Sequence, residues 1–337
     1  MREISLINWA FNLLVRPTSV KALKKGDKKK MNLIKKVTIL IVFLFTSQLA
    51  LAKSSSLVDT DWLANNINNP KVSIIEVSVK PGVYERGHIQ GAVNFKWHTD
   101  LVDTVSRDII SKDKLQNLLR KSGVNQDSTI VLYGDKNNWF AAWGAWVFDI
   151  YGIQNVKLLD GGRKKWEAEK RPLTLLATTV KAGNIELTKT NPGLRARLSD
   201  VVAVAKKESN IALVDIRSAD EYQGKIFAPA GVPELSVRAG HIPGAVNISW
   251  GKAVNKDGTI KSADELKKIY AAAGIDGSKP IITYCRIGER SSHSWFVLKK
   301  VLGYDARNYD GSWTEYGNSV GNPITCLLYT SPSPRDS

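Results

Sequence analysis

Cys285 and the charged residues after it are the part of this sequence best suited to chemistry. The run Thr283-Tyr284-Cys285-Arg286-Ile287-Gly288-Glu289-Arg290 ends an apolar segment, and a helix-compatible stretch, Ser291 to Leu302, follows. A thiol at such a turn faces backbone N–H groups and the positive end of a helix, with two arginines beside it. This environment favours the thiolate, which is the nucleophilic form of cysteine. Because the same groups can hold an anion, we expect a cysteine enzyme with a small anionic substrate.

The N-terminal region carries an export pattern. Lys35-Lys36 precedes the apolar run Val37 to Phe45, and Ala50-Leu51-Ala52 offers a cleavage site, so residues 31–52 are interpreted as a signal peptide. The apolar run is shorter than the ~20 residues needed to span a bilayer. We therefore expect no stable membrane anchor after cleavage, and a periplasmic or secreted bacterial protein. Residues 1–30 lie upstream of this signal and are interpreted as a non-native extension.

The C-terminal residues 326–337 resemble a translated sequencing adapter, and we interpret them as an artefact. Cys326 would then not be a native residue, which leaves Cys285 as the only thiol. A single cysteine in an exported protein cannot form an internal disulfide. A chemical role for Cys285 is therefore favoured.

Charge and composition narrow the class of partner. The chain has 48 Lys and Arg against 32 Asp and Glu, a net charge of +16, and setting both ends aside halves this excess. The mildly basic remainder suits an anionic substrate, and it contains no dense basic run of the kind that binds nucleic acid. The 4 histidines are scattered, so no metal site and no cofactor are expected.

An internal repeat divides the chain into two related halves. Gly87 to Asn94 returns as Gly240 to Asn247, and Leu159 to Gly162 is matched by Tyr309 to Ser312, in the same order. Repeated blocks in register indicate two copies of one domain. We predict the first domain at residues 57–175, a linker at 176–195 and the second domain at 196–325.

Each half alternates β-rich runs with helical patterns, which predicts an α/β fold with a parallel sheet covered by helices on both faces. The expected strands are Val72 to Val79, Ile130 to Tyr133, Val156 to Leu159, Ile211 to Ile216 and Pro280 to Tyr284; the expected helices are Ser111 to Lys121 and Asp264 to Ala273. Ser262 and Glu265 form a capping-box pattern before the second helix. Sites in such sheets form at the carboxyl ends of strands, where Cys285 lies.

The repeated blocks, the Asp215-x-Arg217 pair and the loop at 285–290 together resemble the tandem-domain rhodaneses, the thiosulfate sulfurtransferases, from about Leu57 to Ile324. The resemblance implies two rhodanese-like domains, with the active site of the second facing the first. It also implies transfer of sulfane sulfur from thiosulfate to cyanide or another thiophilic acceptor through a Cys285 persulfide, with ping-pong kinetics.

The family's chemistry assigns roles to the residues of the loop. Arg286 and Arg290 suit bidentate contact with the thiosulfate sulfonate. The amides of Ile287, Gly288, Glu289 and Arg290 would stabilise the anionic sulfur, and Ser291 completes the expected substrate-binding set. In the first domain Asp135 stands where the second has Cys285, and a carboxylate cannot carry sulfane sulfur. We therefore expect the first domain to be catalytically silent and to give structural support.

Other functions stay open at this point. A 3-mercaptopyruvate sulfurtransferase would share the fold but carries a more neutral loop in the family, and a periplasmic sulfane-sulfur carrier would load sulfur with little turnover. A phosphatase is disfavoured, because the dual-specificity phosphatases that share this fold place five residues between Cys and Arg, whereas Cys285 and Arg290 enclose fewer. His88 and His241 are expected to brace turns, and Asp215 and Arg217 to form a structural ion pair. Trp139, Phe140, Trp143 and Trp146 are expected in the core.

Overall fold

The computed structural model describes residues 56–233 and 235–326. The predicted upstream extension, the signal peptide and the tail beyond Cys326 lie outside the described residues. All described residues fall within one compact unit. In the described part of the chain, no helix is long and apolar enough to cross a membrane.

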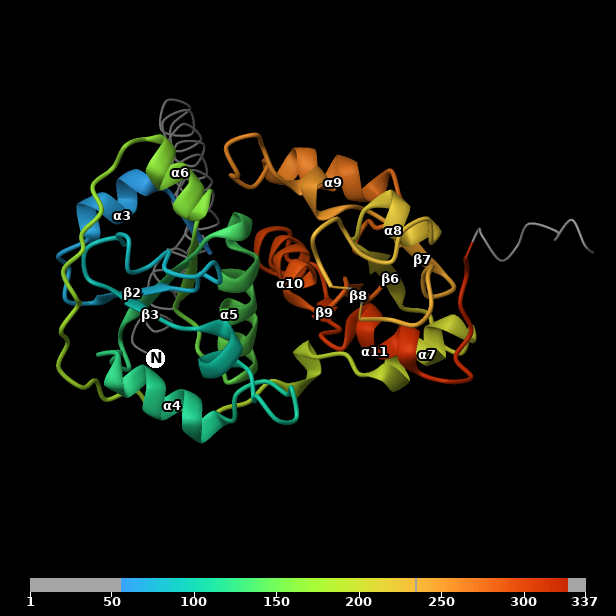
Figure 1. Cartoon of the computed structure of the whole chain (residues 1–337), viewed down its shortest axis with the longest axis horizontal. Helices are drawn as coiled ribbons and strands as arrows, with labels where there is room; N and C mark the ends of the chain where they lie inside the picture. Colours follow the sequence, from blue (N-terminus) through green and yellow to red (C-terminus); the bar gives the residue numbers. More distant parts are fainter. Residues whose placement is uncertain (1–55, 234, 327–337) are drawn as a thin grey trace, which may run out of the picture. The chain divides into compact units, whose positions relative to one another are not determined.

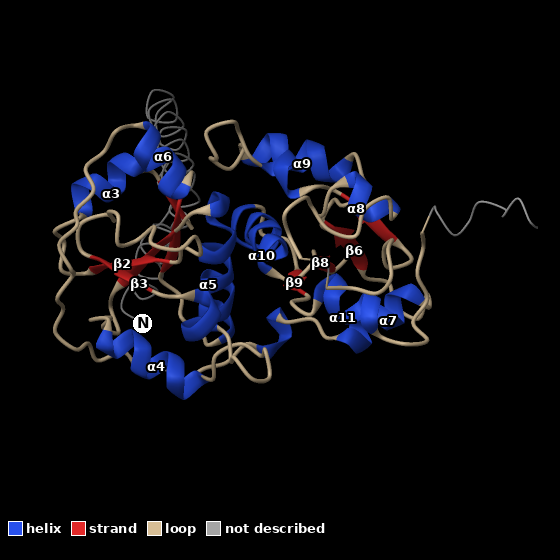
Figure 2. Cartoon of the chain, in the orientation of Figure 1, coloured by secondary structure: helices blue, strands red, loops and turns tan. Residues whose placement is uncertain are grey.

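Two parallel sheets, one in each half, form the framework of the protein (Figures 1 and 2). The first has the strand order β1-β5-β4-β2-β3 and the second the order β7-β6-β8-β9. Read from its other edge, the second order is β9-β8-β6-β7, which corresponds strand by strand to β5-β4-β2-β3 of the first sheet. Two copies of one domain require this correspondence. The strands are β1 (Leu57–Val58), β2 (Val72–Glu76), β3 (Ala92–Asn94), β4 (Thr129–Tyr133), β5 (Val156–Leu159), β6 (Ala212–Asp215), β7 (Ala245–Asn247), β8 (Ile281–Tyr284) and β9 (Ala306–Asn308).

Helices connect the strands in both halves. The α-helices are α3 (Thr60–Asn66), α4 (Lys112–Lys121), α5 (Trp139–Ile150), α6 (Gly162–Ala168), α7 (Leu198–Ala205), α8 (Ala219–Gln223), α9 (Ala263–Ala271), α10 (Glu289–Phe296) and α11 (Ser312–Asn318). The fold class is therefore the predicted α/β arrangement. The predicted linker, 176–195, falls between α6 and α7, in a stretch whose regular element is a short turn at Pro192–Leu194. The predicted domain boundaries themselves stay predictions.

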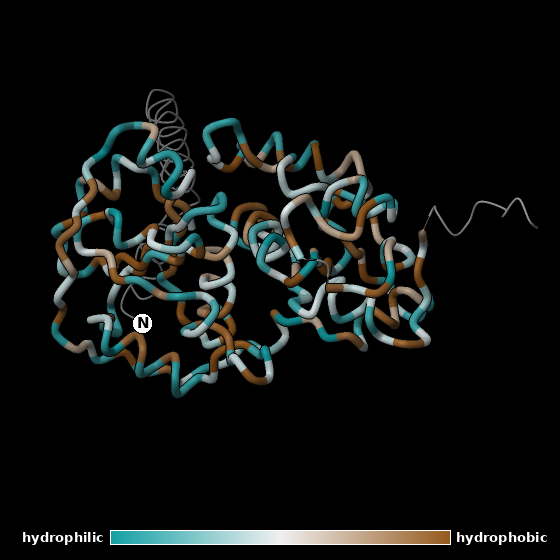
Figure 3. The backbone as a smooth tube through the Cα atoms, in the orientation of Figure 1, coloured by the Kyte–Doolittle hydropathy of each residue, from teal (hydrophilic) through white to brown (hydrophobic). Residues whose placement is uncertain are grey.

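The hydrophobic pattern explains why the central strands form. β4 and β8 are continuous apolar runs that are almost wholly buried, as expected for strands covered on both faces. The outer helices α4 and α9 alternate between hydrophilic and hydrophobic residues along their length (Figure 3). The predicted capping box is confirmed, because Ser262 accepts the Glu265 amide while the Glu265 carboxylate accepts the Ser262 amide.

The helix after the cysteine loop differs from its prediction. It begins at Glu289, two residues before the predicted start, and its α-helical part ends at Phe296, with a wider π turn (η5) over Val297–Val301. The early start has a local cause: Gly288 has φ +99° and reverses the chain directly before the helix.

The two halves share an apolar core. α5 of the first half packs against α10 of the second, and residues of both halves belong to one buried cluster. Trp143 and Trp146 of α5 are fully buried and Phe140 is nearly so, which confirms their predicted place in the core; Trp139 is only half-buried against it. The helix that follows the Cys285 loop, α10, therefore packs on a surface that α5 of the first half provides.

Candidate active site

Cys285 lies directly after β8, at the carboxyl end of the strand, as the sequence predicts. Its side chain is fully buried. Its backbone N–H donates to the Ser312 hydroxyl at 3.1 Å, and the Ser312 hydroxyl donates to the Tyr309 carbonyl. The first turn of α11 therefore fixes the position of the cysteine backbone.

The loop folds back over the sulfur. The Gly288 amide donates to Cys285 Sγ at 3.0 Å, and Sγ lies 3.6 Å from Oε2 of Glu289 and 4.0 Å from the Ser312 hydroxyl. A side-chain carboxylate next to the sulfur was not anticipated, because the sequence reasoning assigned Glu289 a role only through its amide. The thiol is thus placed between an N–H donor and a proton acceptor.

The prediction that the loop favours the thiolate form of Cys285 is wrong. Burial raises the pKa of the Cys285 thiol, and the Glu289 carboxylate raises it further. Arg290 and the amide and hydroxyl of Ser291 lower this pKa, but they do not outweigh the two opposing effects. The sequence reasoning counted the arginines and amides and left out burial and the neighbouring acid. Burial and the neighbouring carboxylate therefore favour the neutral thiol in the resting structure.

Arg290 is held by an internal partner. Two of its guanidinium nitrogens lie 3.0 Å from the two carboxylate oxygens of Glu221, on α8, and both side chains are buried. Burial alone would lower the pKa of Arg290, but Glu221 and the nearby Cys285 and Glu289 raise it overall. Its guanidinium therefore acts as a fixed positive charge near the sulfur, and direct contact with substrate stays a prediction.

Arg286 and Ile287 form the half-buried outer part of the loop. The Arg286 guanidinium donates to the Pro233 carbonyl at 3.0 Å, while its own backbone carbonyl accepts the Thr314 amide. The next residues of the loop and helix, Gly288, Glu289 and Ser291, are buried. Of the two loop arginines, Arg286 is the one whose side chain is more open to solvent, so it is better placed to meet an incoming anion.

The first half of the chain completes the back of the loop. A side chain at Gly288 would meet Cζ3 of Trp143 at 2.7 Å and the Asp310 backbone at 2.7 Å, so the loop backbone lies directly on the Trp143 ring. Arg107, also from the first half, donates to the Ile287 carbonyl at 2.8 Å. The resemblance implied that the active site faces the first domain, and these contacts place the Cys285 loop against the first half of the chain.

Comparisons with known proteins agree with this geometry. The family model for the rhodanese-like domain matches residues 59–169 and 199–319. The chain belongs to the rhodanese family. A Mycolicibacterium smegmatis protein named "Putative thiosulfate sulfurtransferase" is 51% identical over 278 residues, 81% of this chain and 99% of that protein. A Thermus thermophilus protein named "Sulfur carrier protein TtuD" is 49% identical over 272 residues, 80% of this chain and 95% of that protein.

Solved structures share the arrangement of both halves. The crystal structure of YnjE has a TM-score of 0.70 and 25% identity, covering 80% of this chain and 68% of that one. An anaerobic ergothioneine biosynthesis enzyme from Chlorobium limicola has a TM-score of 0.68 and 24% identity, covering 80% of this chain and 70% of that one. At this level of identity the second likeness concerns the fold alone.

The first rhodanese domain has an ordered but different loop at the equivalent position. The Asp135 carboxylate accepts the amides of Val79 and Lys80 at 3.1 and 3.0 Å. Asn138 adopts a left-handed conformation and holds the loop through the Gly134 amide and the Leu159 carbonyl. The Asp135 carboxylate thus ties two segments of the first domain together, which gives it a structural role.

The other residues selected from the sequence have structural contacts. His88 stacks on Tyr84 and His241 on Tyr222, and each ring Nδ1 lies beside the carbonyl of the same tyrosine, as expected for turn braces. Asp215 and Arg217 form the predicted buried ion pair at 2.6 Å.

Three residues of the site were missed by sequence reasoning: Glu221, Ser312 and Arg107. Glu221 had a visible signal, because Ser218-x-x-Glu221 is a capping-box pattern, but this pattern predicts only the start of α8. The contacts of Ser312 and Arg107 depend on long-range packing. Of these two, Arg107 has a signal in the repeat, because the second copy has Gly258 in the corresponding segment.

Replacing Glu289 by glutamine should make the thiol more reactive in this rhodanese. The substitution removes the negative charge 3.6 Å from Sγ, so the pKa of Cys285 should fall and the thiolate fraction at pH 7 should rise. We expect iodoacetamide to alkylate Cys285 roughly threefold to tenfold faster at pH 7. Glu265→Gln, in the exposed capping box of α9, is the control. Equal alkylation rates at all pH values in wild type and Glu289→Gln would contradict the assigned role of the carboxylate.

Proposed function

We propose that this rhodanese is a thiosulfate sulfurtransferase that carries sulfane sulfur on Cys285. The observation that carries the proposal is the position of the single active-loop thiol, at the carboxyl end of β8 with the Gly288 amide on its sulfur. Family membership and the names of the relatives support sulfur transfer in general. We propose thiosulfate as the donor, cyanide or another thiophile as the acceptor, and a persulfide on Cys285 as the intermediate.

The first half-reaction transfers one sulfur atom. The Cys285 thiol loses its proton to solvent, and the thiolate attacks the outer sulfur of thiosulfate. A new S–S bond forms to Sγ, the S–S bond of thiosulfate breaks, and sulfite leaves with the electron pair. The product on the enzyme is a persulfide. The amides of Gly288 and Ser291, which point at Sγ in the resting state, supply donors for its negative charge.

The second half-reaction returns the thiol. A thiophilic acceptor, cyanide in the generic assay, attacks the outer sulfur of the persulfide and leaves as thiocyanate, while the bond electrons return to Sγ. The thiolate then regains from solvent the proton that it lost in the first half-reaction. In the first half-reaction, Arg286 would hold the sulfonate of the donor at the loop surface, and Arg290 would contribute its fixed charge from the buried side of the loop. Because Sγ is buried, the outer loop around Arg286 has to move to admit the donor.

Steady-state kinetics test the proposal. Purified protein should convert thiosulfate and cyanide to thiocyanate and sulfite with parallel double-reciprocal lines, the pattern of a ping-pong mechanism. Cys285→Ala should show no turnover above background, with an unchanged far-UV circular dichroism spectrum. Turnover by Cys285→Ala, or intersecting lines for wild type, would contradict the persulfide route.

A sulfur-carrier role is the second candidate, and two observations favour it. Cys285 Sγ is inaccessible in the resting structure, and a relative at 49% identity is named a sulfur carrier. A carrier would still accept sulfur from thiosulfate on Cys285, but its turnover with cyanide would be negligible. Stable loading with slow thiocyanate formation therefore decides for the carrier. Faster loading from 3-mercaptopyruvate than from thiosulfate would instead indicate a mercaptopyruvate sulfurtransferase.

A further inference from the structure

Arg107 is one of the described non-glycine residues whose backbone has a positive φ. It lies in a hairpin loop of the first domain that is closed by the isolated bridge Val102↔Ile109, and it has φ +56°. Only glycine adopts such angles without a steric penalty. The corresponding hairpin in the second domain is closed by the bridge Val254↔Ile260 and is one residue shorter. Counted back from the second residue of each bridge, Arg107 matches Gly258, which also has a positive φ, +91°. The first domain thus has an arginine at a position where the second domain has a glycine, the residue that adopts this backbone conformation without strain.

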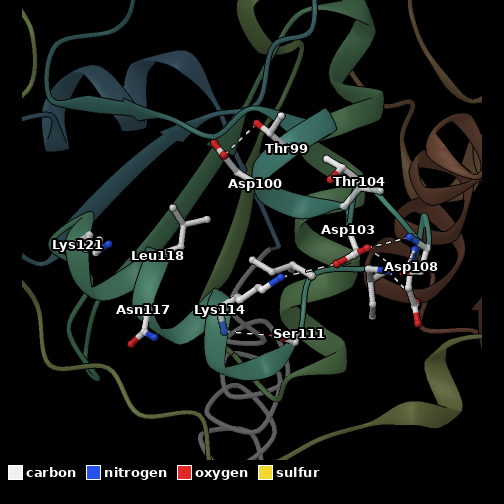
Figure 4. A pocket seen from close by; sticks show the side chains of 14 residues that line it. Thr99, Asp100, Asp103, Thr104, Asp108, Ser111, Lys114, Asn117, Leu118 and Lys121 are labelled. Atoms are coloured by element: carbon white, nitrogen blue, oxygen red, sulfur yellow. Dashed lines mark hydrogen bonds and ion pairs between the residues drawn. The ribbon is translucent and has the colours of Figure 1, made fainter.

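The surrounding residues hold this strained arginine toward the catalytic loop. Asp103 accepts the amides of Val105 and Ser106 and the Ser106 hydroxyl, and it pairs with Lys114 of α4 (Figure 4). On the other side of Arg107, Asp108 pairs with Arg195, whose guanidinium also makes two bonds to Asp310 of the second domain. The hairpin is therefore anchored on both domains.

The side chain of Arg107 contacts the peptide unit that binds the sulfur. Its Nη2 donates to the Ile287 carbonyl at 2.8 Å, and its guanidinium lies 5.7 Å from the centre of the Trp97 ring. The N–H of that same peptide unit belongs to Gly288 and donates to Cys285 Sγ at 3.0 Å. One peptide plane thus links the guanidinium on one side to the sulfur on the other. Trp97 packs against Trp143, the ring under Gly288.

A cation on a peptide carbonyl strengthens the N–H of that peptide as a donor, because hydrogen bonds in a chain polarise one another. A stronger donor stabilises the anionic sulfur more than the neutral thiol. We propose that Arg107 is a positioning residue of the catalytic centre: through the Ile287–Gly288 peptide it orients and polarises the amide that holds the thiolate and the persulfide. The catalytically silent domain then contributes to the chemistry as well as to support. The persulfide part rests on the function proposed above.

Other charged groups lie near the sulfur or contact residues near it, and they must be held constant in a test. They are Glu289 and Arg290 on α10, Glu221 of α8 behind Arg290, and Asp310, whose backbone lies against Gly288. These four groups belong to the second domain, whereas Arg107 reaches the loop from the first. The Arg107 guanidinium bonds the Ile287 carbonyl, so its removal deletes no bond of these four groups. The Asp108–Arg195 pair of the same hairpin, through which Asp310 is linked to it, keeps both partners.

The decisive variant is Arg107→Gly, which places in the first domain the residue found in the second. Glycine accepts the hairpin conformation, so folding should be retained. We expect the pH profile of Cys285 alkylation by iodoacetamide to shift to higher pH, with a rate at pH 7 about threefold to tenfold lower. At a pH where the thiol is fully ionised, the wild-type and variant rates should converge. Sulfur loading from thiosulfate should slow by the same factor at pH 7, and Arg107→Lys should recover part of it.

Lys164→Ala is the matched control. Lys164 donates to the Lys256 carbonyl at 2.6 Å, so it is also a cation of the first domain that bonds a backbone carbonyl of the second. Its partner, however, lies in the hairpin at 254–260 and not in the Cys285 loop. Its alkylation profile should match that of wild type. If Arg107→Gly also has the wild-type profile, or loses rate equally at all pH values, the proposal is overturned. Alkylation requires no sulfur donor, so a wild-type protein that takes no sulfur from thiosulfate would refute the proposed function and leave this test intact.

Discussion

Gly288→Ala should reduce the rate of sulfur loading on Cys285 by about a hundredfold. A Cβ at this position would lie 2.7 Å from Trp143 Cζ3 and 2.7 Å from the Asp310 Cα, and neither a buried ring nor a backbone atom can move aside cheaply. The residue also has φ +99°, which disfavours any side chain. The loop must therefore shift, and the Gly288 amide leaves the sulfur. A displacement of about 1 Å at a reacting centre can cost roughly 10²-fold in rate.

Gly244→Ala is the matched control for this prediction. Gly244 has φ +83°, but a Cβ there would meet its nearest atoms only at 3.9 and 4.0 Å. It carries a similar conformational penalty without the clash or any contact with the sulfur. Loading should be followed by rapid quench after mixing with thiosulfate, with intact mass as the readout. A Gly288→Ala rate within threefold of the Gly244→Ala rate would show that the tight packing of the loop is unimportant.

Glu221→Ala should lower the free energy of unfolding by about 3–5 kcal/mol, the range found when one partner of a buried ion pair is removed. The substitution would leave the Arg290 guanidinium buried without its bidentate carboxylate. It would also remove the acceptor that caps α8 at Ser218. The measurement is equilibrium unfolding in urea.

Two further variants separate the ion pair from general effects of mutation. Asp220→Ala removes an exposed partner of Lys225 at 3.8 Å and should change stability by at most about 0.5 kcal/mol. Replacing the buried pair together, Glu221→Leu with Arg290→Met, should restore most of the stability, because no unpaired charge remains. A loss below about 1 kcal/mol for Glu221→Ala would mean that solvent reaches Arg290 and that its charge is not fixed.

The sequence predicts those features that depend on local pattern. The strands ending at Tyr133 and Tyr284, the capping box at Ser262 and the place of Cys285 after a buried strand were all found correctly, since each depends on a few neighbouring residues. The repeat added the relation between the two halves. These features determine where the nucleophile is.

The electrostatic state of the thiol could not be predicted in the same way. It depends on how deeply Cys285 is buried and on which way the Glu289 side chain turns, and both are set by the packing of the loop on Trp143 and α11. The contact of Arg107 depends on a hairpin far away in sequence. A list of basic residues near a cysteine therefore overstated how strongly the loop favours a thiolate.

A single-turnover loading experiment tests the central claim most directly. Protein is mixed with excess thiosulfate and no acceptor, and intact mass and released sulfite are measured together for wild type and Cys285→Ala. The account predicts the gain of one sulfur atom and the release of one sulfite per wild-type chain, with the added sulfur on the Cys285 peptide and no gain in the variant. An unchanged wild-type mass, or an equal gain in Cys285→Ala, would contradict it.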